Sequence, residues 1–109
     1  MASDDAANEG VQPIGGLDRV IHEPARLMIV AVLSAVESAD FLFLARETGL
    51  TRGNLSTHLA KLEAAGYVDI RKEFVGKIPR TLARLTPAGR DALAAYAHAI
   101  RGALGRLSG

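Results

Sequence analysis

Hydrophobic residues between positions 51 and 65 recur with the period of an α-helix. Leu55, Leu59 and Leu62 follow one another at spacings of four and three, which places them on one stripe of the helix. The other side of this predicted helix is small and polar, and it comprises Gly53, Asn54, Ser56, Thr57, Ala60, Lys61 and Ala64. Gly66 stands where a left-handed residue commonly ends a helix. The pattern predicts a helix that can approach another molecule closely, although an ordinary solvated surface helix has the same composition.

A second apolar segment precedes this helix. Residues 41–44 (FLFL) are short, apolar and aromatic, so on their own they fit a strand. The turn that follows favours a helix over Leu42–Thr48, because helix-turn-helix units use short turns that contain glycine. In this interpretation Gly49 ends the first helix, Leu50 fills the turn and Thr51 caps the second helix.

The residues after Gly66 alternate with the period of a half-buried strand. Over residues 67–74 the positions assigned to the inner side are Val68, Ile70 and Phe74, and those assigned to the outer side are Tyr67, Asp69, Arg71 and Glu73. A return strand is predicted over Thr81–Leu85, with Ala83 and Leu85 facing inward. Two strands this close along the chain predict a β-hairpin.

The turn of this hairpin is predicted over about residues 75–80. Gly76 and Pro79 punctuate it, and they leave Lys77 and Arg80 at the exposed end. Hairpin tips are commonly polar and solvated, so the tip alone does not define a function. Two helices, a hairpin and a basic tip follow one another without spare residues, which is the layout of a winged helix-turn-helix. The predicted fold is therefore mainly α with a small β-hairpin (α+β).

Two further helices are predicted to flank this unit. Residues 1–16 have the composition of a disordered tail, and a short helical entry over 17–21 leads to Pro24 at the start of a helix over Pro24–Val36. That helix is apolar nearly all round, so it needs cover on more than one side. One small core covers one side, and a partner subunit would cover the other, with Leu27 and Val30 in the contact.

The last helix is predicted over about residues 87–107, after the N-cap and first-turn proline of Thr86-Pro87. Its apolar stripe, at spacings of three and four, is Leu93, Tyr96, Ile100, Leu104 and Leu107. No other element is left in the chain to bury so long a stripe. We expect it to pack against the apolar helix over Pro24–Val36 and its symmetry mate in a twofold dimer, the alternative being a helix folded back on its own domain.

Charge is distributed unevenly, although the net charge is only +1. Residues 1–23 carry five acids and one arginine, a net of −4. Residues 51–84 carry seven basic and three acidic side chains, a net of +4. The positive charge is thus concentrated on the predicted helix and hairpin, as expected of a surface that binds nucleic acid.

Length and composition fit one domain, predicted over residues 17–109. The chain has 109 residues and is 49% hydrophobic, with no apolar run long enough to span a membrane and no basic, apolar leader. It has no cysteine, which fits the reducing cytoplasm, our expected location. No nucleophile–base pair, phosphate loop or carboxylate pair stands out, so we expect no enzyme and no cofactor.

The strings LSTHLAKLEAAGYVDI, GKIPRT and RLTPAGRDAL resemble the MarR/ArsR-type winged-helix transcriptional regulators, in their small stand-alone form. The resemblance covers about residues 17–104 and is most specific over 56–93. It implies a homodimer, with flanking N- and C-terminal dimerisation helices, that binds double-stranded operator DNA and commonly answers a small-molecule or protein signal. Since the chain lacks cysteine and His22, His58 and His98 lie far apart, a metal-sensing member is not expected.

The same resemblance implies which residues would touch DNA. On the helix over 51–65, those placed toward the major groove or its phosphates are Thr51, Arg52, Asn54, Ser56, Thr57 and Lys61. Lys77 and Arg80 take the place of contacts from the wing, as the hairpin of this fold is called. His58 matches a histidine that usually lies beside the core or near a phosphate. The alternative function is that of a winged-helix module that binds another protein and does not bind DNA.

Overall fold

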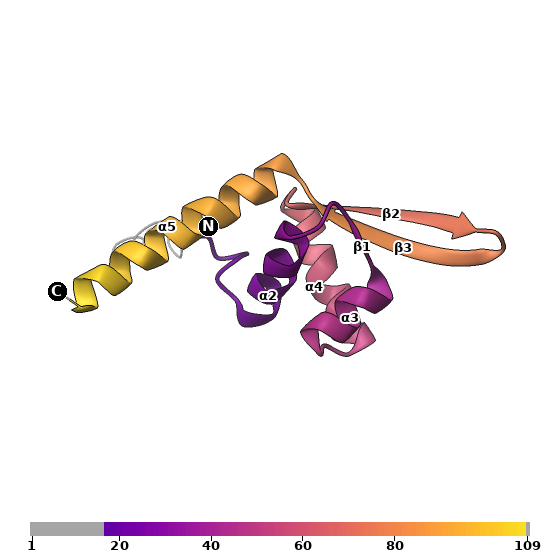
Figure 1. Cartoon of the computed structure of the whole chain (residues 1–109), viewed down its shortest axis with the longest axis horizontal. Coiled ribbons are helices and arrows are strands. Elements are labelled where there is room, and N and C mark those ends of the chain that lie inside the picture. Colours follow the sequence, from indigo (N-terminus) through magenta and orange to yellow (C-terminus); the bar gives the residue numbers. More distant parts are fainter. Residues whose placement is uncertain (1–16, 109) are drawn as a thin grey trace, which may run out of the picture.

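The computed structural model describes residues 17–108, so the predicted tail over 1–16 lies outside the described residues. Its elements, in chain order, are α2 (Pro24–Ser34), β1 (Ala39–Asp40), α3 (Phe41–Thr48), α4 (Arg52–Ala64), β2 (Val68–Val75), β3 (Ile78–Leu85) and α5 (Pro87–Ser108) (Figure 1). Helices α2, α3 and α4 pack together at one end of a three-stranded antiparallel sheet of order β1-β3-β2. The predicted winged-helix fold of the α+β class is confirmed.

The core lies between the three helices and the inner face of the sheet. Its buried apolar side chains are Ile21, Ile29, Val30, Leu33, Ala39, Leu44, Leu55, Leu59, Leu62, Val68, Ala83 and Leu85. The stripe predicted for α4 is thus the buried stripe. Of the positions predicted to face inward on the hairpin, Val68, Ala83 and Leu85 are buried and Ile70 is half-buried. Hydrophobic periodicity fixes which side of each of these elements faces the core.

The ends of α4 follow from its capping residues. The Thr51 hydroxyl accepts a hydrogen bond from the Asn54 amide at 3.1 Å. At the other end Gly66 has φ +82°, and its amide donates to the Glu63 carbonyl at 2.9 Å while the next amide reaches Leu62 at 3.0 Å. These are the two bonds of a Schellman motif, which satisfies the last carbonyls of the helix.

Residues 41–44 form the start of α3, which confirms the helix that the following turn favoured over a strand. The strand lies just before them. The two residues of β1 pair with β3, Ala39 opposite Ala83 and Asp40 opposite Leu82. The hydrophobic pattern did not predict β1, because two residues are too few to show a period.

The hairpin is longer than predicted. The return strand β3 begins at Ile78, and only Gly76 and Lys77 form the turn, with Gly76 at φ +64° as expected at the first loop position of a tight hairpin. Pro79 therefore lies in β3, where β1 does not reach and no hydrogen bond from its nitrogen is needed. Phe74, predicted to face inward, is 72% exposed because the hairpin extends past the core.

The N-terminal flank also differs in part from the prediction. Helix α2 ends at Ser34 rather than at residue 36. Residues 17–21 form a turn rather than a helix, because the Asp18 carboxylate accepts hydrogen bonds from the amides of Val20 and Ile21 at 2.8 and 3.1 Å.

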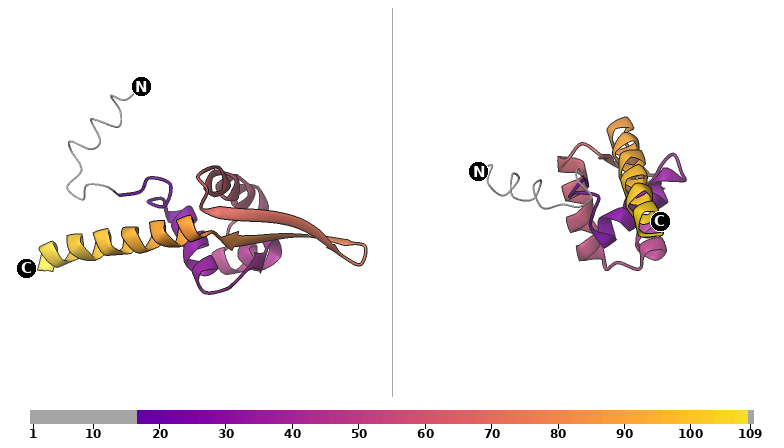
Figure 2. Two further views of the ribbon diagram at one scale, coloured as in Figure 1. Left: turned by 90° about the horizontal axis from the view of Figure 1, so that it is seen from above. Right: turned by 90° about the vertical axis from the view of Figure 1, so that its left-hand side faces the viewer.

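The first half of helix α5 packs against the body, where Leu93 and Tyr96 lie against the core, and the second half continues beyond it. The hairpin projects from the opposite side of the body, so the two elements point away from each other (Figures 1 and 2). The molecule is correspondingly elongated, with principal extents of 54, 35 and 25 Å. The winged-helix body thus has two projecting arms, the hairpin and the outer half of α5, which extend in opposite directions.

Candidate DNA-binding surface

The outer face of α4 is exposed and has no large apolar side chain. Six of the residues implied in DNA contact, Thr51, Arg52, Asn54, Ser56, Thr57 and Lys61, are all exposed. Directly opposite the buried leucines the helix shows only Gly53, Thr57, Ala60 and Ala64, with longer polar side chains on the flanks. A helix with a smooth centre and polar flanks can enter a groove and place donors and acceptors against its edges.

Two hydroxyls on this face already take part in the hydrogen bonding of the helix. Thr57 donates to the Gly53 carbonyl at 3.0 Å, so its oxygen is left to accept a hydrogen bond. Thr51 accepts from the backbone as the cap, so its hydroxyl proton is left to donate. The first amides of α4 add partial positive charge beside Arg52, a combination that favours a phosphate.

His58 differs from its six neighbours because it is half-buried and turned toward α2. Its Nδ1 accepts a hydrogen bond from the Arg26 guanidinium, 3.2 Å from Nη1. The same guanidinium donates from Nε to the Val20 carbonyl at 2.6 Å. Since an arginine can only donate, this contact needs an unprotonated Nδ1. The structure therefore places His58 as a link between α4 and the N-terminal segment, rather than on the outer face.

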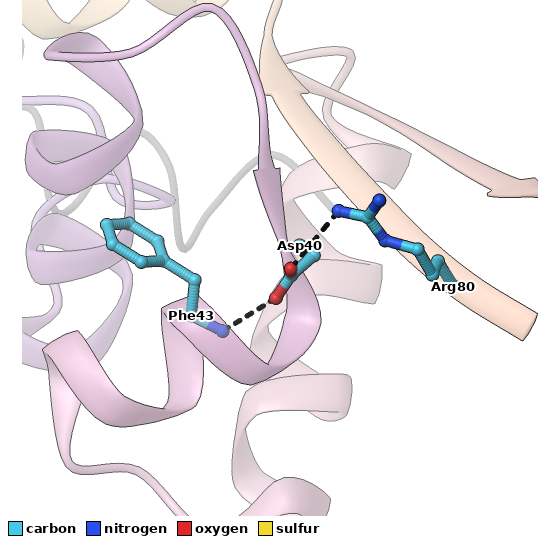
Figure 3. Close-up of polar contacts among 3 residues, drawn as sticks. All are labelled: Asp40, Phe43 and Arg80. Carbon is cyan, nitrogen blue, oxygen red and sulfur yellow. Dashed lines mark hydrogen bonds and ion pairs between the residues drawn. The ribbon is translucent and has the colours of Figure 1, made fainter. Parts of the chain in front are cut away.

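Arg80 of β3 reaches across to the start of α3 (Figure 3). Its Nη2 lies 3.3 Å from Oδ2 of Asp40, and the two side chains are 41% and 34% exposed. The other carboxylate oxygen of Asp40 accepts the Phe43 amide at 2.8 Å, which caps α3. One carboxylate thus joins the first helix of the helix-turn-helix to the hairpin and sets the direction of the Arg80 side chain.

The same two contacts act on the acidity of Asp40. The hydrogen bond from the Phe43 amide lowers the pKa of Asp40, and the nearby charge of Arg80 lowers it further. The carboxylate is therefore ionised throughout the neutral range. Nothing in the sequence signalled this pairing, because residues 40 and 80 are brought together by the short strand β1.

The hairpin adds a second concentration of positive charge. Its outer part, residues 71–80, has four basic side chains, Arg71, Lys72, Lys77 and Arg80, and a single acid, Glu73. At the base of the hairpin Arg84 pairs with Asp69 across the strands at 3.6 Å. Charge is thus balanced near the core and positive toward the tip, where Lys77 is exposed.

The N-terminal segment, residues 17–23, lies before α2 and contacts both the start of the hairpin and α5. The hydroxyl of Tyr67 donates a hydrogen bond to the Asp18 carboxylate, and His22 contacts the hydroxyl of Tyr96 on α5 at 2.8 Å between Nδ1 and oxygen. The hydrogen bond to Asp18, together with burial, raises the pKa of Tyr67 to about 12. Sequence patterns did not reveal these contacts, since each partner is a lone polar residue far away in the chain.

The residues predicted for a dimer contact fall into three groups. Val30 is fully buried within its own domain, so it has no surface to offer a partner and the prediction for it is wrong. Leu27 and three α5 residues, Leu93, Tyr96 and Ile100, are half-buried. Leu104 and Leu107 are 56% and 82% exposed, on the part of α5 beyond the body.

Among residues 17–108 no group of three or more histidine, aspartate or glutamate side chains is arranged to hold a metal ion. Within the same range no helix has both the length and the apolarity needed to cross a bilayer.

A helix-turn-helix with an exposed second helix, followed by a basic hairpin, defines the class of winged-helix DNA-binding proteins. The sequence comparison agrees with that class. Residues 25–104 match the family model described as winged helix DNA-binding domain, and the chain belongs to this family. The family and the fold are those of DNA-binding transcriptional regulators and not of enzymes.

The chain is similar to proteins from several organisms. It is 33% identical over 82 residues to an uncharacterized protein of Methanocaldococcus jannaschii, covering 75% of this chain and 89% of that protein. Among solved structures it resembles a transcriptional regulator homologue of Pyrococcus horikoshii, with a TM-score of 0.77, 27% identity and coverage of 83% and 89% of the two chains. A MarR-family transcriptional regulator of Silicibacter pomeroyi gives a TM-score of 0.61 at 26% identity, covering 81% of this chain and 58% of that one.

Proposed function

We propose that the protein is a cytoplasmic homodimer that binds an inverted-repeat operator in double-stranded DNA. Each α4 enters a major groove, and the two half-sites lie about one helical turn, roughly 34 Å, apart on one face of the duplex. Each hairpin lies over the adjacent minor groove. The observation that carries the proposal is the exposed, unobstructed face of α4 beside a hairpin whose outer part is strongly basic.

The residues of α4 divide by reach and chemistry. Arg52, Asn54, Ser56 and Thr57 read base edges, since arginine suits guanine and asparagine suits adenine. Lys61, on the flank of the helix, binds a phosphate, as does Lys77 at the turn of the hairpin. Thr51 adds its hydroxyl proton at the N-terminus of the helix. His58 acts through Arg26 by holding α4 in place rather than by touching DNA.

Arg80 is assigned to the minor groove. Narrow stretches of that groove concentrate negative potential and attract arginine side chains. The ion pair with Asp40 supports this assignment in one respect, because it holds the guanidinium beside the hairpin instead of leaving it to swing freely. A guanidinium has five N–H donors, and the pair with Asp40 uses one nitrogen, so others remain for DNA.

Dimerisation is assigned to α5 together with Leu27. Leu104 and Leu107 continue the half-buried stripe of α5 past the body, and exposed leucines in line with a packed stripe favour a second helix as their cover. A twofold axis near this end leaves the hairpins at the two outer ends of the dimer, because α5 and the hairpin point in opposite directions (Figure 1).

Selection of bound duplexes from a random-sequence library tests the proposal, followed by a salt titration on the recovered duplex. We expect an inverted repeat whose affinity falls steeply as salt rises, because basic side chains displace counterions from phosphates. Recovery of a single, non-repeated site would contradict the dimeric arrangement. No recovery at low salt by a folded protein would contradict DNA binding by this surface and favour the protein-binding alternative.

A further inference from the structure

The tip of the hairpin, residues 74–79, is apolar as well as basic. Phe74 is 72% exposed, Ile78 67% and Val75 51%, and Pro79 is exposed beside them. Lys77 is the only charged residue among these six. The sequence predicts a basic turn over about residues 75–80 and an inward-facing Phe74, so the apolar tip is a feature that only the structure reveals.

This apolar surface is unusual in its position. The tip stands clear of the body (Figure 2), and none of residues 74–79 belongs to the core cluster. Soluble domains expose single apolar side chains freely, but several together on a projecting element usually mark a surface that binds something. Turn residues of a solvated hairpin are normally polar. A partner is therefore expected to cover the tip.

The two faces of the tip are both apolar. Phe74 lies opposite Pro79, and Val75 lies opposite Ile78. Since successive residues of a strand point to opposite faces, the first pair covers one face of the hairpin and the second pair covers the other. A flat docking surface needs apolar residues on one face only. Apolar residues on both faces suit insertion between two walls.

Each face also carries a cation behind the apolar pair. Lys72 lies two residues before Phe74 on one face, and Arg80 lies two residues after Ile78 on the other. On that second face Glu73 is the cross-strand neighbour of Arg80, and Arg71 lies behind Glu73, so the face keeps a net positive charge. Two residues of a strand span about 7 Å, within the reach of a long basic side chain. A cation on each side of an apolar wedge matches a groove with two negatively charged walls, which is the form of the minor groove of DNA.

We propose that the hairpin tip is an apolar wedge that enters the minor groove of the bound duplex and bends it. Phe74 and Ile78 lie against the sugars or between two base pairs, while Lys72 and Arg80 bind the phosphates on either wall. Apolar side chains of this kind open base steps in other minor-groove complexes. The inference rests on the proposed function and deepens it, because it makes DNA deformation part of operator choice.

The test compares two double variants on the duplex that the wild-type protein recovers from the random library. Phe74→Thr with Ile78→Thr removes the wedge but keeps residues that favour strands. Phe74→Leu with Ile78→Leu keeps an apolar tip and is the matched control. Lys77→Ala removes a charge and leaves the wedge. Affinity is measured over a range of salt concentrations, and the bend is measured by energy transfer between dyes at the two ends of the duplex.

We expect the threonine pair to bind at least about tenfold more weakly, with an unchanged salt slope and a straighter duplex. The leucine pair should resemble the wild type, and Lys77→Ala should flatten the salt slope while the bend persists. Unchanged affinity and bend in the threonine pair would overturn the wedge while leaving DNA binding intact. A wild-type protein that recovers no duplex would instead overturn the proposed function. If the threonine pair changes only the self-association of the free protein, measured by sedimentation, the tip is a contact between copies and the wedge is wrong.

Discussion

The hairpin and the outer half of α5 are both arms that leave the core, and both expose apolar side chains, but they do so differently. The hairpin tip is apolar on two faces and has a cation behind each of them. The outer half of α5 is apolar along one stripe, which ends in Leu104 and Leu107. Exposure of apolar area alone therefore does not identify a partner.

The charges and shapes around that area make the distinction. A two-sided tip with flanking cations fits a groove with phosphate walls, whereas a single stripe in line with packed residues fits a second helix. Both arms start from the same small region of the body. Thr86, which caps α5, donates its amide to the Tyr67 carbonyl at 3.0 Å and its hydroxyl to Gly66 at 2.6 Å, just before β2 begins.

The largest effect is expected where the two arms meet. In Gly89→Val the new Cβ would overlap the carbonyl of Tyr67 and approach Cδ1 of Leu85 to 2.9 Å. Neither backbone nor buried leucine can move far, so we expect a loss of about 3 kcal/mol in the free energy of unfolding. Urea denaturation measures it. Gly102→Ala on the same helix, where the nearest atom lies at 4.0 Å, is the control, and equal stability of the two variants would contradict the junction described.

The second-largest effect is expected from substitutions on α5 that disrupt the proposed dimer. Leu104→Asp with Leu107→Asp places charges on the stripe of α5, and we expect a monomer because like charges would face each other across the twofold axis. Affinity for a duplex with two half-sites should fall about a hundredfold, since the second half-site is no longer bound by a linked subunit. Sedimentation equilibrium gives the mass and fluorescence anisotropy gives the affinity. An unchanged mass would remove α5 from the interface.

A smaller effect is expected from the charge of the hairpin. Arg80→Ala should weaken binding about tenfold and reduce the slope of affinity against salt by about one. Arg101→Ala, an exposed arginine on α5, is the matched control and should change neither. Anisotropy titrations at several salt concentrations measure both quantities. Equal behaviour of the two variants would show that Arg80 stays with Asp40 and does not reach DNA.

The smallest effect concerns the region that joins the arms. The pKa of Tyr67 is raised to about 12 from an ordinary value of 10.0, so its contribution is complete below pH 10 and is lost as pH rises through 12. Tyr67→Phe should therefore be less stable than the wild type below pH 10, and the difference should shrink toward pH 12. Urea midpoints across this range measure it. Tyr96→Phe should keep the wild-type dependence of stability on pH. A difference in stability between Tyr67→Phe and the wild type that stays constant with pH would exclude the contact with Asp18.

Local sequence patterns predict some of these features and not others. The buried stripe of α4, its two ends and the hairpin were predicted, because period, capping residues and alternation act over a few neighbouring positions. The contact between Asp40 and Arg80 and the close approach at Gly89 were missed, because they depend on segments far apart in the chain. Phe74 was misplaced for a related reason: alternation shows which face a residue takes, but it does not show where the core ends.

Hydroxyl-radical footprinting on the duplex recovered from the random library tests the central claim most directly. If two copies of α4 bind adjacent major grooves with the hairpins outside them, two protected half-sites should lie about one helical turn apart on one face of the duplex. Minor-groove protection should flank them at both outer ends and should disappear in the threonine variant of the tip. A single protected site, or protection between the half-sites without protection outside them, would contradict the arrangement of the arms.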